Sequence, residues 1–129
     1  MPSVSRFMTV HPVTIDRAST LAVARKLMQA HDIRHLPVTG DGHLVGIVSE
    51  RDLQLLASTV DPEATRVDQA MTSNPFIVTG DTALDEITEI MADQKYSSVI
   101  VMGRDGVEGI FTAVDACRAL TTILRRDAA

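Results

Sequence analysis

The feature that most constrains this chain is an internal repeat, because the sequence resembles itself after a shift of 63 positions. The shift places Met8-Thr9 on Met71-Thr72, Pro12 on Pro75, Gly46-Ile47 on Gly109-Ile110, and Asp52 on Asp115. A single offset kept without a gap over about forty-five residues indicates two copies of one structural unit. We place the first copy at residues 1–60 and the second at 61–129, with a short polar linker at residues 58–64.

Both copies predict the same order of elements, β-α-β-β-α. Short β-type runs follow Pro12 and Pro75, and apolar residues then recur at helical spacing: Leu21, Ala24 and Met28 in the first copy, Leu84, Ile87 and Met91 in the second. Strands at residues 36–39 and 44–48, and again at 99–102 and 107–111, are separated by Gly/Asp-rich hairpin turns. Helices at residues 52–57 and 115–124 close the copies, and Thr82 with Asp85 suggests a capping box. The predicted fold class is α/β.

Composition restricts the partners of such a fold. Hydrophobic residues make up 45% of the 129 residues, which is enough to build a core. The 12 Lys and Arg against 17 Asp and Glu give a net charge of −5, which disfavours nucleic acid and anionic membrane surfaces. We therefore expect no nucleic-acid partner and no membrane partner, and any phosphate site must be local.

The cysteine content and the N-terminal residues bear on the cellular compartment of the protein. Cys117 is the only cysteine, so no intrachain disulfide can form, and we interpret it as a small buried hydrophobe. Residues 1–7 lack the apolar stretch of a secretory signal, and no run approaches the length of a membrane span. These features predict a cytoplasmic protein.

The motifs of the two copies resemble cystathionine-β-synthase (CBS) domains, and the pair resembles a Bateman module. The resemblance covers about residues 4–124 and depends on three groups of residues. These are Met8-Thr9, Pro12 and Thr14; the run Ile33-Arg34-His35-Leu36-Pro37-Val38; and Gly46-Ile47-Val48-Ser49-Glu50-Arg51-Asp52. The second copy keeps Gly109 to Asp115 but has Tyr96-Ser97-Ser98 in place of the Arg-His run. The resemblance implies two CBS repeats packed as a pseudo-twofold pair.

A Gly-x-x-Ser/Thr-x-x-Asp pattern occurs once in each copy, where a strand gives way to a helix. Ser49 and Thr112 can cap the helix and offer a hydroxyl, and backbone N–H groups at a helix start favour an anion. The alternative is that these residues are ordinary caps and that Asp52 and Asp115 only complement the helix dipole. The family resemblance favours nucleotide binding, with Asp52 and Asp115 holding riboses.

Positive charge is the second requirement of a phosphate site. Arg34, His35 and Arg51 supply it in the first copy, and Arg is suited to bidentate phosphate contact. In the family, phosphate and ribose contacts come from opposite repeats, so the resemblance implies a charged site for the nucleotide on Asp115 and an uncharged one on Asp52. The alternative is that Arg34 is a solvated surface residue and His35 a packed strand histidine. The predicted ligand-binding residues are Thr14, Arg34, His35, Ser49, Arg51, Asp52, Ile77, Ser97, Ser98, Thr112 and Asp115.

These residues predict a regulatory module that binds an adenosine-type nucleotide between its repeats, with no required cofactor and no catalysis. His31 and His35 have helical spacing for a metal, but His35 enters a strand and no third ligand is evident. By resemblance the chain should form a homodimer through helices at residues 22–28, 53–57 and 116–124, and it has an unidentified regulated protein as a further candidate partner. The competing hypothesis is a ligand-independent scaffold protein. An enzyme would need a nucleophile or base that the sequence does not show.

Overall fold

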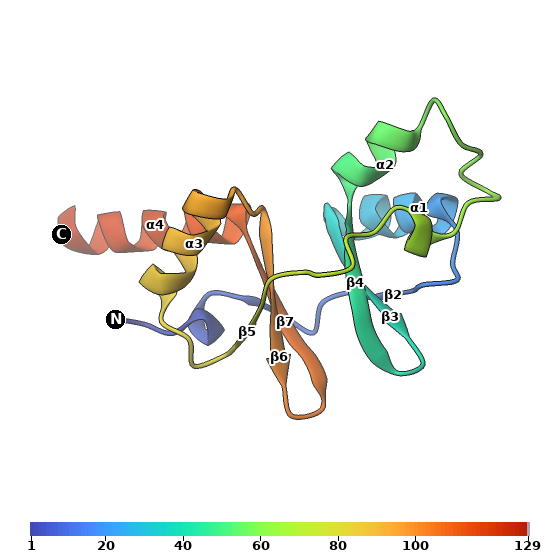
Figure 1. Ribbon diagram of the computed structural model, residues 1–129. Coiled ribbons are helices and arrows are strands. Elements are labelled where there is room, and N and C mark those ends of the chain that lie inside the picture. The colour runs from blue at the N-terminus through green and yellow to red at the C-terminus, as the bar shows by residue number, and fades with distance from the viewer. Residues whose placement is uncertain (129) are drawn as a thin grey trace. The chain divides into compact units, whose positions relative to one another are not determined.

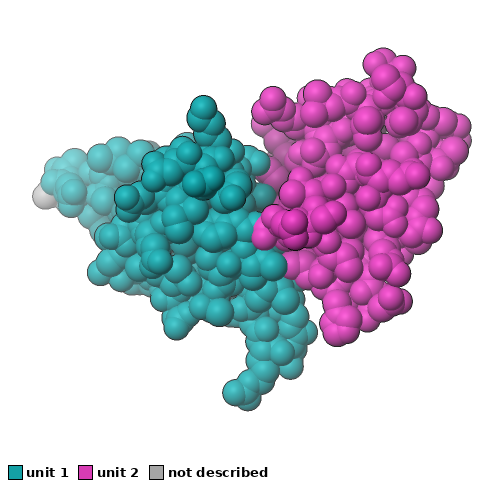
Figure 2. Space-filling view, viewed as in Figure 1, with its two compact units in different colours: residues 1–11, 76–129 teal, residues 12–75 magenta. Residues whose placement is uncertain are grey.

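The computed structural model describes residues 1–128. They form two compact units, drawn as a ribbon in Figure 1 and in two colours in Figure 2. Unit 1 contains residues 1–11 and the chain from residue 76 onward, and unit 2 contains residues 12–75. The units in space therefore differ from the copies in sequence: residues 1–11 pack with the second copy, and residues 61–75 pack with the first.

Unit 2 is a three-stranded sheet with two helices. Its strands are β2 (Ile15–Asp16), β3 (His35–Gly40) and β4 (His43–Ser49), in the order β2-β3-β4. Strand β2 is parallel to β3, and β3 forms an antiparallel hairpin with β4. The helices are α1 (Leu21–His31) and α2 (Glu50–Leu56), and a short 3-10 helix, η2 (Val67–Gln69), follows.

Unit 1 repeats this plan with one more strand. Its sheet has the order β1-β7-β6-β5, built from β1 (Thr9–Val10), β5 (Ile77–Thr79), β6 (Ser98–Gly103) and β7 (Gly106–Thr112). The helices are α3 (Leu84–Gln94) and α4 (Ala113–Ala128), and the 3-10 helix η1 (Val4–Arg6) lies near the N-terminus. The predicted α/β class and the β-α-β-β-α order are confirmed in both units.

Each unit has its own apolar core. The predicted helical stripes are confirmed, since Leu21, Ala24 and Met28 of α1 and Leu84, Ile87 and Met91 of α3 are buried. They pack against strand residues such as Leu36 and Val38 in unit 2 and Val99 and Phe111 in unit 1. The predicted β3–β4 turn is also present, where Asp41 and Gly42 both have the positive φ that tight hairpins require.

A segment from the other copy completes each unit. In unit 1, Val4 is fully buried and its N–H donates to Thr82 O at 2.9 Å; in unit 2 the equivalent Val67 is fully buried and donates to Ser19 O at 2.7 Å. The repeated Met-Thr pair of each such segment then lies closely against a glycine of the sheet, Gly109 in unit 1 and Gly46 in unit 2. A Cβ on Gly109 would lie 2.9 Å from Thr9 O, and one on Gly46 would lie 2.6 Å from Thr72 O. Glycine is therefore required at both crossings.

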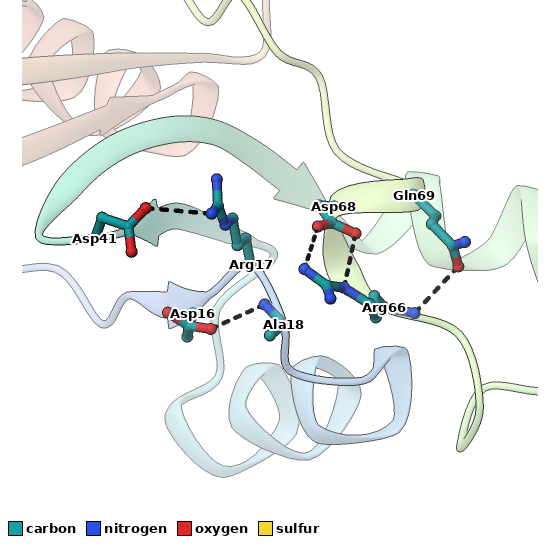
Figure 3. A network of polar contacts seen from close by, with 7 residues as sticks. All are labelled: Asp16, Arg17, Ala18, Asp41, Arg66, Asp68 and Gln69. Atoms are coloured by element: carbon teal, nitrogen blue, oxygen red, sulfur yellow. Dashed lines mark hydrogen bonds and ion pairs between the residues drawn. The ribbon is translucent and has the colours of Figure 1, made fainter.

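Polar contacts order the completing segment of unit 2, and Figure 3 shows those within residues 66–69 and those of the neighbouring Asp16 and Arg17. The guanidinium of Arg66 donates twice to the Asp68 carboxylate, at 2.7 and 3.3 Å, and the Arg66 N–H donates to Gln69 Oε1. Asp68 N–H in turn donates to Arg17 O at 3.2 Å. Arg17 also pairs with Asp41 of the hairpin turn at 3.2 Å. Residues 66–69 are thus tied to the edge of the sheet.

Two local predictions are wrong. Helix α3 begins after Ala83, which makes no side-chain cap, so Thr82 and Asp85 do not form the expected capping box. Cys117 is exposed, because the buried side of α4 carries Asp115 and Ala119 instead. Asp85 Oδ1 accepts from the N–H of Glu86, its own neighbour, which leaves the helix start without a reciprocal cap.

Candidate ligand-binding site

The first predicted site lies where β4 ends and α2 begins. Ser49 is the N-cap of α2, and its hydroxyl accepts from Asp52 N–H at 3.2 Å. Asp52 Oδ2 accepts from Ser49 N–H at 2.8 Å, so the two residues form a reciprocal capping box. No hydrogen bond to Asp52 Oδ1 is present among residues 1–128, and Asp52 is only half-buried. One oxygen of this carboxylate is therefore available to a hydroxyl group.

The predicted cations gather at the same end of the sheet. His35 begins β3 and lies opposite Ser49 in the β3–β4 pairing, and Arg34 O accepts from Glu50 N–H at 2.9 Å. Arg34 and Arg51 are exposed, and His35 is half-buried. Unit 2 thus brings Arg34, His35, Ser49, Arg51 and Asp52 together. Thr14, just before the edge strand β2, is exposed and lies outside this group of contacts.

The equivalent site of unit 1 is more enclosed. Asp115 is 7% exposed; its Oδ2 accepts from the backbone N–H of Thr112 at 2.9 Å and from the Thr112 hydroxyl at 3.2 Å. Its Oδ1 accepts from the hydroxyl of Thr9 at 3.4 Å. Thr9 was not among the ligand-binding residues predicted from the sequence. The repeated pairs Met8-Thr9 and Met71-Thr72 indicated that Thr9 has an equivalent role in both copies. The sequence does not show, however, which of the two sheets each pair joins.

The two serines take the places of the cations in unit 1. Ser98 lies opposite Thr112 in the β6–β7 pairing, and Ser97 O accepts from Ala113 N–H at 3.0 Å. By the repeat offset they replace His35 and Arg34. The two units therefore differ at these positions, with hydroxyls in unit 1 and cations in unit 2. Unequal ligand binding stays a prediction.

The last predicted residue, Ile77, borders a pocket on unit 1. The pocket has a volume of about 370 Å³ and lies along β5, between that strand and α3. Its polar lining comes from Thr79, Thr82 and Glu86, and Ile87 and Met102 belong to its apolar lining. This volume is in the usual range of small-molecule pockets. Ile77 is the one lining residue predicted from the sequence, because the pocket depends on how α3 packs beside the edge strand β5.

No group of three or more His, Cys, Asp or Glu side chains within residues 1–128 is arranged to hold a metal ion. Over the same residues, none of the helices has both the length and the hydropathy needed to cross a membrane.

Comparison with known families shows to which family the chain belongs. The family model for the CBS domain matches twice, at residues 4–57 and 59–122, which is nearly the whole chain. The chain belongs to the CBS-domain family. The resemblance inferred from the sequence is therefore confirmed, and both Gly-x-x-Ser/Thr-x-x-Asp motifs lie inside the matched repeats.

Solved structures give the same result for the fold. AcuB from Vibrio cholerae is 31% identical with a TM-score of 0.88, covering 100% of this chain and 98% of that one. The CBS domain pair of protein MJ0100, in complex with 5′-methylthioadenosine and S-adenosyl-L-methionine, is 25% identical with a TM-score of 0.86, covering 95% and 98%. CBSX2 in complex with AMP is 26% identical with a TM-score of 0.80, also covering 95% and 98%.

Curated relatives include both large and small proteins. Homoserine O-acetyltransferase from Methanosphaerula palustris is 33% identical over 110 residues, which are 78% of this chain but 22% of that enzyme. The CBS domain-containing protein YhcV from Bacillus subtilis is 24% identical over 116 residues, covering 89% of this chain and 83% of YhcV. The chain thus spans about a fifth of the enzyme's length and most of YhcV's.

Proposed function

We propose that this CBS pair is a regulatory module that binds an adenosine-type ligand, such as AMP, ADP, ATP or S-adenosylmethionine, and performs no catalysis itself. The observation that carries the proposal is the hydroxyl–carboxylate pair at the start of both α2 and α4, at Ser49–Asp52 and Thr112–Asp115. Two similar CBS pairs hold adenosine compounds, as their structures with 5′-methylthioadenosine, S-adenosyl-L-methionine and AMP record.

The chemistry of the pair suits a ribose. A carboxylate oxygen accepts about two hydrogen bonds. Asp52 Oδ1 has no partner among residues 1–128. Asp115 Oδ2 already accepts two hydrogen bonds from Thr112, but Asp115 Oδ1 accepts one, from Thr9, and keeps acceptor capacity for a further donor. Two adjacent ribose hydroxyls can donate to such a group. In the proposed site Arg34 and Arg51 contact the phosphate, since both are exposed and positively charged in an acidic protein.

A ligand panel tests the proposal directly. A compound that binds only the folded state at about 100 times its dissociation constant adds about 2.7 kcal/mol of stability. For a chain of this size the melting temperature should rise by about 8 to 13 °C. AMP, ADP, ATP and S-adenosylmethionine should shift the melting curve most, and GTP is the control without adenosine. NADH, which contains an adenosine nucleotide, completes the panel. ATP should be recovered unhydrolysed after incubation.

The second candidate function is that of a ligand-independent scaffold. One observation favours it: Ser49 and Asp52 already satisfy each other as a capping box, so these residues have a structural role without any ligand. If none of the adenosine compounds shifts the melting curve of folded protein, the scaffold hypothesis replaces ligand sensing.

We also propose that two copies associate through their helices. Several large apolar side chains on α4 are exposed: Val114, Leu120, Ile123 and Leu124. An exposed apolar group of this kind on a soluble protein indicates an interaction surface. Light scattering should give twice the chain mass of 14.0 kDa at micromolar concentration.

A further inference from the structure

The pocket beside β5 is separate from the proposed adenosine site of unit 1. It has a volume of about 370 Å³ and follows the edge strand β5 and the helix α3, both labelled in Figure 1. The Thr112–Asp115 pair lies instead at the junction of β7 and α4, and β6 separates β7 from β5 in the sheet. Neither Thr112 nor Asp115 lines the pocket. A ligand of this pocket would therefore be independent of the function proposed above.

Apolar side chains form most of the lining of this pocket. Ile87 is fully buried, and Ile90 and Met102 are half-buried. Phe76 adds a half-buried aromatic ring, which contacts the ring of Tyr96 at a centroid distance of 5.5 Å. The volume is near the lower end of the usual range for small-molecule pockets, so the ligand must be small. An aromatic ring suits this lining, because both a phenyl ring and a methionine sulfur pack favourably against aromatic groups.

The two hydroxyl groups of the lining have no hydrogen left for a ligand. The Thr79 hydroxyl donates its hydrogen to Asp81 Oδ1, and the Thr82 hydroxyl lies 3.4 Å from the Thr79 hydroxyl oxygen. Because the single hydrogen of Thr79 is used by Asp81, Thr82 is the donor of this second bond. A hydroxyl oxygen has two acceptor lone pairs besides its hydrogen. Thr79 and Thr82 can therefore accept a hydrogen bond from a ligand but cannot donate one.

Glu86 supplies the charge of the lining. Its side chain is exposed, and no hydrogen bond or ion pair to its carboxylate is present among residues 1–128. Asp81, also exposed, adds a second negative charge next to Thr79. None of the lining residues, all within residues 76–102, is Lys or Arg. The polar side chains thus offer negative charge and acceptors, and an ammonium group matches them because it has three donors and no acceptor.

The first repeat does not provide the same lining. The repeat offset places Val23 of α1 at the position of Glu86, and Thr39 of β3 at that of Met102. Asp16 takes the position of Thr79, but its Oδ2 accepts from Ala18 N–H at 2.9 Å. The unpaired carboxylate on the first turn of the helix is therefore specific to the second repeat, and we expect one such site in each chain.

From these features we propose that the pocket beside β5 binds a small primary amine in its ammonium form, with an aromatic ring as its apolar body. The ammonium group donates to the Glu86 carboxylate and to the Thr82 hydroxyl oxygen. The ring lies against Phe76, Ile90 and Met102. An alcohol of the same shape lacks the charge, and a carboxylate of the same shape is repelled by Glu86.

A chemical-shift titration of the full chain, labelled with ¹⁵N, tests this site with 2-phenylethylamine as the probe. Near pH 7 and at about 50 mM salt, the amine should shift the amide signals of residues 77–82 and 86–90. The signals of residues 112–115, and those of residues 14–23 in unit 2, should stay in place. 2-Phenylethanol should bind about three-fold more weakly or less, because it cannot pair with a carboxylate. 3-Phenylpropionate should cause no shifts at the same concentration.

Two variants separate the charged contact from the apolar one. Glu86→Gln should lower the affinity for 2-phenylethylamine by about three-fold or more and remove its advantage over 2-phenylethanol. Glu89→Gln is the matched control, because Glu89 is exposed on the same helix but does not line the pocket. Ile90→Ala should weaken the amine and the alcohol equally, since both place the same ring against Ile90.

Several outcomes would overturn the assignment. Equal affinities of the wild-type chain for the amine and the alcohol, or equal effects of Glu86→Gln and Glu89→Gln, would exclude an ammonium site at Glu86. Shifts spread over other acidic surfaces, or no shifts at all, would exclude the pocket. Displacement of 2-phenylethylamine by AMP would show that the two ligands share one site. A chain that binds the amine beside β5 but not AMP would keep this site and lose the adenosine function.

Discussion

The carboxylate of Asp115 has a structural and a proposed binding role at the same time. It accepts from both Thr112 groups and from Thr9, which joins the first strand of the sheet to the start of α4. Asp52 makes the same cap with Ser49 but lacks the third partner. The difference arises from the neighbouring threonine. The Thr9 hydroxyl donates to Asp115, whereas among residues 1–128 the equivalent Thr72 makes backbone hydrogen bonds alone, with Ile47. Equivalent aspartates therefore have unequal surroundings.

The first prediction concerns these two aspartates. If the ligand on Asp115 is the one that meets the cations, as the family resemblance implies, Asp115→Ala should abolish the tighter binding event in calorimetry. Asp52→Ala should leave that event largely intact. A hydrogen bond to a charged group contributes about 1.5 to 3 kcal/mol, which corresponds to about ten- to a hundred-fold in affinity. The reverse ranking would show that each repeat provides its own phosphate contacts.

Asp115→Asn is the matched control for folding. Its amide oxygen can still accept from Thr112 N–H, so the cap is kept while the charge is lost. Asp115→Ala removes the carboxylate contacts of the cap but keeps the residue-115 N–H that donates to the Thr112 hydroxyl, so a loss of about 1 kcal/mol should appear as a lower melting temperature. If Asn binds like wild type and Ala does not, binding needs a polar side chain at this position but not the negative charge of the carboxylate.

A second residue-scale prediction separates phosphate from nucleoside recognition. Arg34 is exposed at the start of β3, close to the Ser49–Asp52 cap, and its guanidinium suits a phosphate. Arg34→Ala should therefore lower the affinity for AMP by about ten-fold or more, but change the affinity for adenosine by less than about two-fold. Calorimetry with both ligands measures the difference. Arg25→Ala removes an equal charge from α1, outside the site, and should affect neither ligand.

At the scale of elements, periodicity and turn chemistry predicted most of the fold. The stripes of α1 and α3 and both hairpins follow from local sequence, because burial of one helix face and tight turns are local requirements. The packing of residues 1–11 with the second copy and of residues 61–75 with the first was not predictable. Met8-Thr9 and Met71-Thr72 offer the same edge to Gly46-Ile47 or Gly109-Ile110, so the repeat itself cannot specify which pairs form. No stripe of large apolar residues marks the buried face of α4 in the sequence, because that face carries Asp115 and Ala119. For this reason the prediction that Cys117 is buried was wrong.

The exchanged segment gives an element-scale prediction. Val4 is fully buried in the core of unit 1, far in sequence from the rest of that core. Val4→Ala should lower the free energy of unfolding by about 1 to 3 kcal/mol, because the lost methyl groups leave a cavity. Val10→Ala is the control, since Val10 is exposed and its truncation should stay within about 0.5 kcal/mol. Chemical denaturation measures both, and a silent Val4→Ala would contradict the assignment of residues 1–11 to unit 1.

At the scale of the whole molecule, the acidic charge is unevenly distributed. The net charge of −5 includes an acidic α3 and a basic α1, which occupy equivalent positions in the two repeats. At the position shared by Lys26 and Glu89, and at that shared by Ala30 and Asp93, the two repeats therefore differ in charge.

The last prediction tests whether the apolar surface of α4 drives the proposed self-association of two copies. Leu124 is 57% exposed, so Leu124→Asp should change the stability of the single chain little, by about 0.5 kcal/mol or less. The same substitution places a charge on an apolar contact and should convert the dimer to a monomer near 14.0 kDa in light scattering. Thr122→Asp adds the same charge to an exposed position on another side of α4 and should leave the dimer intact. Equal effects of the two variants would mean that added charge alone, and not loss of the Leu124 contact, separates the copies.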